Sequence, residues 1–512
     1  MSSDSGRTPP HPWAGCKETH VSAVYLLGDK VLKVKKPVLT DFLDFTTVEA
    51  RLRACHDEVA LNRRLSPDVY LGVASIDLGE DSPEPAVVMR RLADRDRLSS
   101  RLGGDPWRLQ AAVTDVARTI AAFHERSVPN RDDDCPAAWF QLVARWRYEW
   151  NALALLDASF APDNRRSAGR DLGLRYLSGR RALFDTRVRQ GKVRDGHGDL
   201  RADHVYLTRD GVRVVDCLEF DAALRTCDVL ADVAFLAMDL ERLDQPDAAR
   251  HLLDRYRELT DDVYPPSLAD FYIAQRALVR LKVSLLAPGA RTRAAALEQN
   301  RLLSLAERHL VAAQPRVICI GGLPGSGKST IAAAVASQTG AVHLSSDAIR
   351  HERAGEQHTE SAWGTGRYTE AETAAVYDEL LRRATIALSD GYSVVLDASW
   401  RDAGHRDRAR EASRWLGATF TEVRCHAEEP TAYQRLRGTR SGFSEAGVAV
   451  RREMRDAFQP WPTARAVSTD CELRQSLEAV TALLDEGDHA LLAPPAPDVD
   501  AAGYRPTSDL AR

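Results

Sequence analysis

The stretch with the most specific chemistry is residues 316–330, RVICIGGLPGSGKST. An apolar run of strand length is followed by GLPGSGKS, which fits G-x-x-x-x-G-K-[ST] at every fixed position. In this pattern the backbone N–H groups cradle phosphate oxygens, the lysine reaches the β/γ-phosphates and the hydroxyl binds Mg²⁺. It predicts a nucleoside triphosphate site formed by Gly322, Leu323, Pro324, Gly325, Ser326, Gly327, Lys328, Ser329 and Thr330.

Two acids and two arginines complete this predicted site. Asp397 ends the apolar run in SVVLDASW and fits an acid that orients Mg²⁺ through water. Asp347 is similar in position to the base that receives the acceptor proton in P-loop small-molecule and polynucleotide kinases. Each aspartate has a helix N-cap as its alternative role. Arg437 and Arg440 share a helix face and resemble lid arginines that neutralise a transferring phosphoryl group, with a solvated charged face as an equal alternative.

A second chemical centre lies at 195–205, DGHGDLRADHV, followed by DCLEFD at 216–221. Asp199 and Asp216 each stand at the end of an expected hairpin strand, so both carboxylates can converge on one metal–phosphate site. Asp199 would accept the proton of a substrate hydroxyl, and Asp216 would hold Mg²⁺ bridging the β- and γ-phosphates. On spacing alone, the alternative is that these acids cap loops.

His197-Gly198-Asp199 followed by Asp216 resembles the catalytic loop and metal aspartate of aminoglycoside-phosphotransferase-like kinases. Asp228 and Asp232 resemble the Asp-rich helix start of the same family. One departure is His204, which stands where the family pattern has the asparagine for a second Mg²⁺. Imidazole suits softer metals better than Mg²⁺, so a second metal is either different or absent, and in the second case His204 hydrogen-bonds Asp199 or a phosphate.

The stretch VLKVKKP resembles the family strand that carries the ATP-anchoring lysine. The resemblance implies Lys35 in that role, with Lys33 left open, and Glu58 as the helix glutamate that pairs with the lysine. The alternative for Lys35 is an exposed hairpin charge. A second departure is that residues 19–23 contain no glycine, whereas the family covers the phosphates with a Gly-rich turn.

The expected elements place these residues in two domains. Short strands between 21 and 90 precede helices that run to about 313, and beyond them strands and helices alternate. The predicted fold class is α+β protein-kinase-like, with a small β-rich N-lobe and a helical C-lobe, followed by an α/β P-loop kinase-like domain with a parallel five-stranded sheet. The predicted divisions are a disordered lead at 1–15, the kinase-like domain at 16–290, a helical connector at 291–315, the P-loop domain at 316–487 and a disordered tail at 488–512.

Composition excludes several classes of function. A formal net charge of -5 argues against a general polyanion binder, and acids interleave the arginines at 401–414, which favours a solvated helix over a nucleic-acid contact. The eight cysteines include no C-x-x-C pair. No apolar run reaches membrane-spanning length and the first residues lack a signal-peptide core, so we expect a cytoplasmic protein. The sequence leaves the oligomeric state open.

These features predict an ATP-dependent phosphotransferase with two nucleotide-linked sites. The cofactors would be ATP and Mg²⁺, with Mn²⁺ as an alternative, and the partner would be a small-molecule hydroxyl acceptor such as a sugar, amino sugar or aminoglycoside-like compound. Residues from about 20 to 485 resemble two-domain proteins that fuse an aminoglycoside-phosphotransferase-like domain to a P-loop kinase-like ATPase. Two alternatives are a chain in which one domain is catalytically dead and senses nucleotide, and a polynucleotide 5′-hydroxyl kinase in the C-terminal half.

Overall fold

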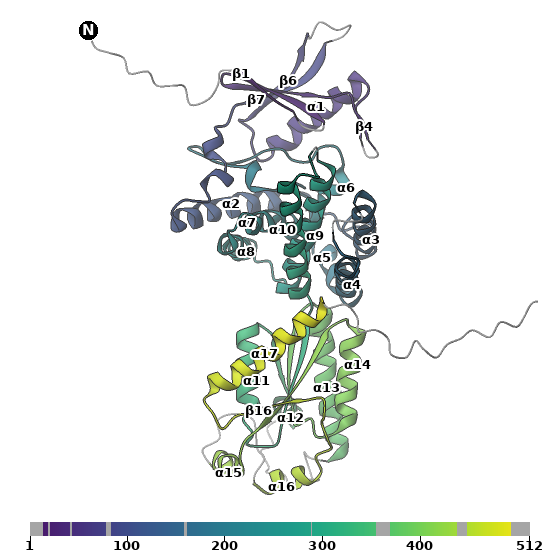
Figure 1. Ribbon diagram of the computed structural model, residues 1–512, viewed down its shortest axis with the longest axis vertical. Helices are drawn as coiled ribbons and strands as arrows, with labels where there is room; N and C mark the ends of the chain where they lie inside the picture. Colours follow the sequence, from purple (N-terminus) through teal and green to yellow (C-terminus); the bar gives the residue numbers. More distant parts are fainter. Residues whose placement is uncertain are drawn as a thin grey trace, which may run out of the picture.

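The computed structural model describes residues 14–18, 21–40, 43–77, 83–157, 161–287, 289–354, 369–437 and 448–492. The expected disordered lead and tail lie almost entirely outside these residues. Three layers follow one another along the long axis: a small β-rich lobe, a helical lobe and a parallel sheet with its covering helices (Figure 1).

The N-lobe is a five-stranded antiparallel sheet in the order β1-β2-β3-β7-β6. Its strands are β1 (Ala14–Glu18), β2 (Ser22–Leu27), β3 (Lys30–Lys35), β6 (Tyr70–Ile76) and β7 (Glu84–Arg90), and a two-residue pair, β4 (Leu39–Thr40) and β5 (Leu43–Asp44), lies beside it. Helix α1 (Val48–Arg63) starts where the Thr47 hydroxyl accepts a hydrogen bond from the Ala50 amide. It buries Cys55 and Val59 against the sheet, so Glu58 on the same helix points towards β3.

The helical lobe contains the largest core of the protein. Its long helices are α2 (Pro106–Arg126), α3 (Trp139–Leu156), α4 (Asp163–Gly179), α5 (Arg181–Arg189), α7 (Val229–Arg242), α8 (Pro246–Thr260), α9 (Pro266–Leu286) and α10 (Arg293–Ala312). Helical periodicity over residues 168–190 predicts one helix, but this is wrong, because the chain breaks at Arg180 and forms α4 and α5. Trp139, Trp146 and Trp150 fall near one face of a helix, a pattern that predicts core residues, and Trp146 and Trp150 are buried.

Short elements at the top of this lobe carry the second chemical centre. They are the 3₁₀ turns η1 (Asp94–Asp96), η2 (Ser99–Arg101) and η3 (Ala202–His204), the strand pairs β8 (Val193–Asp195) with β11 (Thr226–Asp228) and β9 (Val205–Thr208) with β10 (Gly211–Val214), and the one-turn helix α6 (Ala222–Arg225). The loop between β8 and β9 therefore leaves one strand pair and enters the other, which fixes both of its ends.

Helix α10, which the sequence suggests is a connector, packs along α9 inside the helical lobe. Leu302, Leu303 and Leu310 of α10 are buried in the common core. Only a few residues then separate α10 from the first strand of the C-terminal domain.

The C-terminal domain is a parallel five-stranded sheet in the order β13-β14-β12-β15-β16, as predicted. The strands are β12 (Arg316–Gly321), β13 (Val342–Ser345), β14 (Val394–Asp397), β15 (Thr419–His426) and β16 (Arg465–Ser468). The helices are α11 (Lys328–Thr339), α12 (Ser346–Ala354), α13 (Glu370–Ser389), α14 (Ala403–Trp415), α15 (Glu429–Arg437), α16 (Val448–Asp456) and α17 (Leu473–Leu491).

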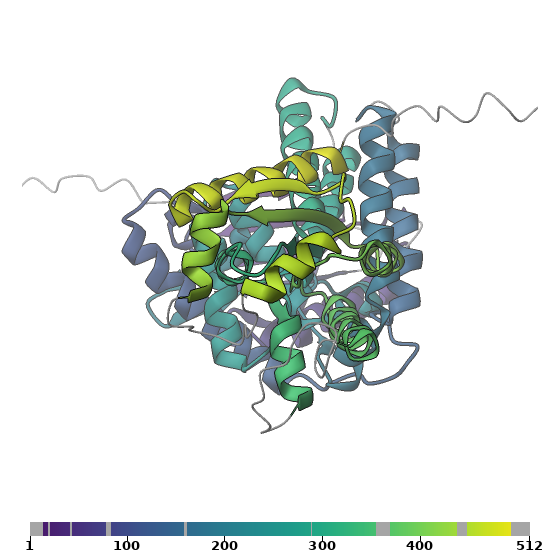
Figure 2. The same ribbon diagram turned by 90° about the horizontal axis from the view of Figure 1, so that it is seen from below.

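Helices cover both faces of this sheet. Alternate residues of β12 explain the arrangement, since Ile318 and Ile320 pack with α11 and α17, whereas Val317 and Cys319 pack with α13 and α14. The view along the long axis shows α17 on one side of the strands and α13 and α14 on the other (Figure 2). Every strand buried on both faces reads as a continuous apolar run, which is why the sequence located this sheet well.

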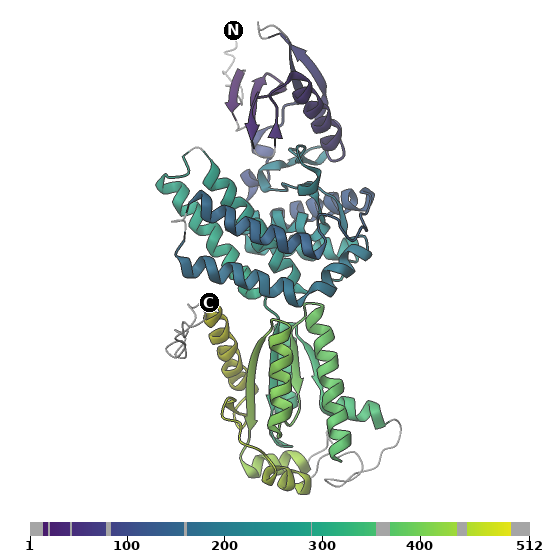
Figure 3. The same ribbon diagram turned by 90° about the vertical axis from the view of Figure 1, so that its right-hand side faces the viewer.

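The helical lobe contacts the edge of the sheet at which the strands begin (Figure 3). Ser267 Oγ donates to Gly391 O at 2.6 Å, just before β14. The buried Arg180 guanidinium donates to Leu416 O, just before β15. The P-loop follows the opposite end of β12, so the two candidate sites lie at opposite ends of the stack.

Candidate nucleotide and phosphotransfer sites

The P-loop joins β12 to α11 at the carboxyl edge of the parallel sheet. Gly322 has φ 146°, and a Cβ there would lie 2.5 Å from Cys425 O. Gly325 has φ 79°, and a Cβ would lie 2.7 Å from Ala432 O. Both positions therefore require glycine, and the resulting turn brings Lys328 to the first residue of α11, where helix N-termini attract phosphate.

Asp397 ends β14 opposite Ile320 of the P-loop strand. Burial acts to raise the pKa of Asp397, but His343, Lys328 and the Ser329 hydroxyl together hold it below its ordinary value. Asp397 Oδ1 and Ser326 Oγ are buried and have no hydrogen-bond partner among the described residues. An ionised carboxylate with one free buried oxygen beside the Ser329 hydroxyl fits the protein share of a Mg²⁺ site, in which phosphates and water would supply the other ligands.

The second acid of this site, Asp347, lies in the first turn of α12 and is paired with Arg350, whose Nη1 is 2.8 Å from Asp347 Oδ1. Both Asp397 and Asp347 act to raise the pKa of Lys328 against its burial. The structure thus brings Lys328, Asp347 and Asp397 into one electrostatic cluster at the end of the sheet.

The arginines that contact the P-loop are different from those that the sequence suggested. Arg437 is exposed at the end of α15, and Arg440 lies outside the described residues. Instead, Arg435 Nη2 donates to Thr469 O at 2.6 Å while the Thr469 hydroxyl donates to Ser326 O at 2.8 Å. Arg451 Nη1 donates to Pro324 O at 2.5 Å. These contacts join loop segments far apart in sequence, so spacing alone gave no signal for them.

The arginine-rich helix α14 is anchored internally. The expectation of a fully solvated helix is wrong at Arg406, which is 4% exposed and donates to Trp400 O and Pro460 O at 2.8 and 2.7 Å. Arg408 pairs with Asp378 and Arg410 with Glu422. The charges of this helix therefore serve mainly to hold the domain together.

In the N-terminal domain, Lys33 and Lys35 lie on the same face of β3 and share one acid. Glu58 accepts from Lys33 Nζ at 2.8 Å and from Lys35 Nζ at 2.6 Å. Lys33 also donates to Asp216 Oδ1 at 2.8 Å, whereas Lys35 donates to Glu219. Lys35 is 1% exposed, so an exposed hairpin charge, the alternative for this residue, is wrong.

Lys33 is the lysine that joins the helix glutamate to the expected metal aspartate. Burial acts to lower the pKa of Lys33, but Asp216 and Glu58 raise it well above the ordinary lysine value. The pKa of Asp216 is correspondingly far below its usual range, first of all because of Lys33. Asp216 itself adopts φ 64°, an uncommon backbone for a non-glycine residue and one often found at functional sites.

The loop between β8 and β9 arranges Asp199, Arg201 and His204. Arg201 Nε lies 3.0 and 3.1 Å from the two carboxylate oxygens of Asp199. His204 Nδ1 lies 2.9 Å from Asp199 O, and its Nε2 lies 2.6 Å from Arg201 Nη2 and 3.5 Å from Asp216 Oδ2. Burial acts to raise the pKa of Asp199, but His204 and Arg201 hold it below its ordinary value.

The position of His204 supports the hydrogen-bonding role more than metal ligation. Its Nε2 can accept a hydrogen bond from Arg201 Nη2. The lone pair used in that bond is the one that a metal beside Asp216 would need. The 3.5 Å separation from Asp216 still places the imidazole beside the expected metal aspartate.

Helix α7 supports the same loop from below. Asp232 accepts the amides of His197 and Gly198 at 2.7 and 2.9 Å. Asp228 caps α7 through the Leu230 amide and accepts hydrogen bonds from Nε and Nη2 of Arg187. The two aspartates of the predicted helix start therefore fix the loop and the helix that carries it.

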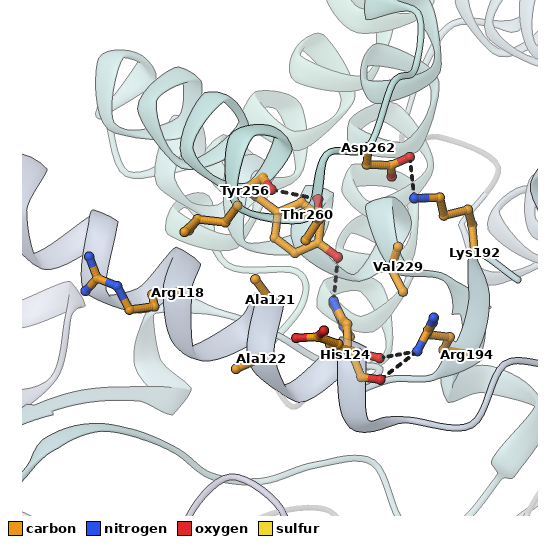
Figure 4. A pocket seen from close by; sticks show the side chains of 12 residues that line it. Arg118, Ala121, Ala122, His124, Lys192, Arg194, Val229, Tyr256, Thr260 and Asp262 are labelled. Carbon is orange, nitrogen blue, oxygen red and sulfur yellow. Dashed lines mark hydrogen bonds and ion pairs between the residues drawn. The ribbon is translucent and has the colours of Figure 1, made fainter. Parts of the chain in front are cut away.

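A pocket of about 330 Å³ lies behind this support. His124 Nε2 lies 3.2 Å from Asp232, and its Nδ1 lies 2.8 Å from the hydroxyl of Tyr256, which lines the pocket (Figure 4). On the opposite wall Lys192 is paired with Asp262 at 2.9 Å. Tyr256, Lys192 and Arg194 are already bonded to other groups of the lining, and neither Asp199 nor Asp216 lines this pocket.

The sequence missed Glu219, Arg201 and Arg435. Glu219 and Arg201 stand within three residues of acids that the sequence singled out, which is a usable signal, because neighbours of a catalytic loop share its site. Among the described residues, no cluster of three or more His, Cys, Asp or Glu side chains is arranged to hold a metal by itself. In the same part of the chain, no helix is long and apolar enough to cross a membrane.

Comparisons with known proteins agree with this geometry. Residues 22–271 match the Phosphotransferase enzyme family, and residues 317–461 match an AAA domain family. Rv2004c, an uncharacterized protein of Mycobacterium tuberculosis, is 36% identical over 475 residues, which are 91% of this chain and 94% of the relative. These matches confirm the resemblance seen in the sequence.

Similar solved structures include APH(2")-IIia in its GDP and kanamycin complex, 16% identical over 58% of this chain and 93% of that chain, with a TM-score of 0.39. A gluconokinase from Sinorhizobium meliloti is 19% identical over 35% of this chain and 95% of that chain, with a TM-score of 0.28.

Proposed function

Because this chain belongs to the family of two-domain proteins that join a phosphotransferase-family domain to an AAA domain, we propose that it transfers the γ-phosphoryl group of ATP to a hydroxyl of a small molecule. Both domains belong to kinase or phosphotransferase families, so the chain is an enzyme of that class. The observation that carries the proposal is the convergence of Lys33, Glu58 and Asp216 beside Asp199.

In the N-terminal site each side chain has one task. Lys33, held by Glu58, would bind ATP phosphate, and Asp216 would hold Mg²⁺, which would supply positive charge against the phosphates. Asp199 receives the proton of the acceptor hydroxyl while the hydroxyl oxygen bonds to the γ-phosphorus and the bond to ADP breaks. Arg201 orients the Asp199 carboxylate through its two contacts.

In the C-terminal site the P-loop amides and Lys328 bind the triphosphate. Ser329 and Asp397 are the residues that would hold Mg²⁺, and the free Oδ1 of Asp397 supports this assignment. Asp347, held by Arg350, would receive the proton of a second acceptor hydroxyl or of water. Transfer to an acceptor hydroxyl would make this site a kinase, and transfer to water would make it an ATPase.

One variant at each site tests the proposal on the full chain. We would incubate γ-labelled ATP and a metabolite pool with the parent, Asp199→Asn and Lys328→Ala. Loss of a positioned base costs about 10²–10⁴-fold in rate, so Asp199→Asn should abolish one labelled product and keep the other. Lys328→Ala should do the reverse. A product that survives both single variants at the parental rate would show that neither site transfers phosphoryl groups.

A second candidate function is a nucleotide-sensing N-terminal domain without turnover. It is favoured by the direct contacts of Arg201 with Asp199 and of Lys33 with Asp216, and by His204 in place of asparagine. In that case Asp199→Asn changes no product, whereas Asp216→Asn weakens nucleotide binding by the domain. Nucleotide binding depends on Asp216 in both cases, so the labelled products of Asp199→Asn and of its parent, both in the Lys328→Ala background, separate the two functions.

A further inference from the structure

Arg280 of α9 is a half-buried arginine whose charge acts on Asp199, the proposed base. Arg280 itself forms no ion pair with any described residue. Among the residues that the structure describes, no carboxylate lies within 4.0 Å of its guanidinium and no hydrogen bond to it is formed. A partly buried, unpaired guanidinium is unfavourable because arginine stays protonated in proteins. The unpaired charge of Arg280 at this position therefore requires an explanation.

The acids around Arg280 are already bound by other groups. Asp199 is contacted by Arg201 through both carboxylate oxygens. Asp239 accepts from the Ala202 amide at 2.9 Å and from Arg242 Nε at 2.8 Å. Both of these acids are therefore already paired with an arginine other than Arg280.

The pKa of Arg280 agrees with its lack of an ion pair. Burial and then the nearby Arg201 lower the pKa of Arg280, while Asp199 and Asp239 only partly oppose them. Arg280 in turn is one of the groups that lower the pKa of Asp199. Arg201 contacts the carboxylate that would take the acceptor proton, and the charge of Arg280 acts on the same carboxylate.

The neighbouring cations of α9 are used differently. Arg276, one turn earlier, donates to Ala231 O at 3.0 Å and lies over the Phe235 ring, so it is part of the packing against α7. Lys282 is paired with Glu149 of α3 at 2.7 Å. Arg280 differs from both in having a charge that no described residue satisfies.

We propose that Arg280, together with Arg201, binds an anionic group of the phosphoryl acceptor, a carboxylate or a phosphate, next to the hydroxyl that Asp199 deprotonates. This inference rests on the proposed function of the N-terminal site. A guanidinium fork matches the two oxygens of either anion. A cationic acceptor such as an amino sugar would instead meet two like charges. The acceptor class is therefore hydroxy acids, acidic sugars or sugar phosphates.

Matched probes test the charge requirement in the full-length Lys328→Ala protein. Calorimetric titration would compare gluconate with glucose, glycerol 3-phosphate with glycerol, and glucosamine as the cation. We expect at least one anion to bind about tenfold or more tightly than its neutral partner, the size expected for one charge-assisted contact. Arg280→Gln should remove that difference and Arg280→Lys should restore part of it. Arg250→Gln, an exposed arginine paired with Asp247, is the control and should change nothing.

Phosphate of the nucleotide is the other possible source of the anion, so ATP is titrated in parallel. If Arg280→Gln weakens ATP and leaves the anionic probes unchanged, the inference is wrong. Equal binding of anionic and neutral partners, or no binding of any anion, also overturns it. Phosphoryl transfer to a neutral or cationic acceptor that Arg280→Gln leaves unchanged overturns the inference and keeps the proposed function. If anion binding depends on Arg280 but no phosphoryl group is transferred, the inference stands and the proposed function is wrong.

Discussion

At the scale of single residues, the two lysines of β3 separate into different roles. Lys33 touches both Glu58 and Asp216, whereas Lys35 is enclosed between Glu58 and Glu219. The sequence resemblance favoured Lys35 as the ATP lysine, and the geometry gives Lys33 the contact with the metal aspartate. Lys35 is placed to hold the loop after Asp216 against the N-lobe.

This difference predicts opposite phenotypes for the two lysines. Lys33→Met should weaken nucleotide binding at the N-terminal site and destabilise the fold less than Lys35→Met, because Lys33 is partly exposed and its partner Asp216 is half exposed. Lys35→Met leaves Glu58 and Glu219 with one buried cation fewer, and breaking a buried ion pair costs about 3–5 kcal/mol. Urea unfolding and ATP titration in the Lys328→Ala background measure both quantities. The assignment of roles is wrong if Lys35→Met weakens ATP binding and leaves the free energy of unfolding unchanged.

His204 carries the next prediction. Because its Nε2 is already in contact with Arg201, we expect His204→Asn and the parent to share the same preference for Mg²⁺ over Mn²⁺ and Co²⁺. The measurement is the rate of phosphoryl transfer with each metal in both proteins. A parent that prefers Mn²⁺ or Co²⁺, and a variant that returns to Mg²⁺, would show that the imidazole binds the metal.

At the scale of elements, α10 is fixed to the helical lobe by a charged histidine. His309 Nδ1 lies 2.8 Å from Asp270 Oδ1 of α9, and its Nε2 lies 3.0 Å from Glu241 Oε2 of α7. Burial acts to lower the pKa of His309, but the two carboxylates raise it to about 9. Three helices therefore meet at one protonated side chain, just before the chain enters the C-terminal domain.

The raised pKa predicts how stability depends on pH. Since the folded state binds the proton more tightly than the unfolded state, the contribution is complete below about pH 6.5 and is lost as pH rises towards 9. His309→Gln should reduce the free energy of unfolding by up to about 3 kcal/mol at pH 6 relative to its effect at pH 9. Urea unfolding across this range measures the difference. The exposed His56→Gln serves as control, and a difference that does not change with pH contradicts the prediction.

At the scale of the whole molecule, the junction between the domains consists of side chains that meet backbone carbonyls. Ser267 binds Gly391 O and also lies 3.2 Å from the Tyr176 hydroxyl, which connects the junction to the core of the helical lobe. Arg180 reaches Leu416 O from a fully buried position. Such a junction allows little sliding, so we expect the two domains to unfold together.

A single glycine tests the junction. Gly391 has φ 86°, and a Cβ there would lie 2.8 Å from both Pro265 Cγ and Ser267 Oγ. Gly340 has a similar φ of 68° and no atom within 4 Å of the same position. Gly391→Ala should therefore split the calorimetric unfolding into two transitions, whereas Gly340→Ala should only lower the single transition slightly through backbone strain. If the two variants behave alike, the junction does not couple the domains.

The sequence alone predicted the P-loop, the two aspartates proposed for the N-terminal site and the two fold classes, because these predictions depend on local patterns. Glycine spacing in GLPGSGKS and apolar runs such as VVLD are read within a few residues. Tertiary structure decided what depends on contacts between distant segments. In the folded chain Lys33 contacts Asp216, Arg435 lies beside the P-loop and the helix breaks at Arg180. Arg280 has no acid partner among the described residues. No spacing encodes these results, since charge balance at a site depends on which side chains the packing of α7, α9 and β3 brings together.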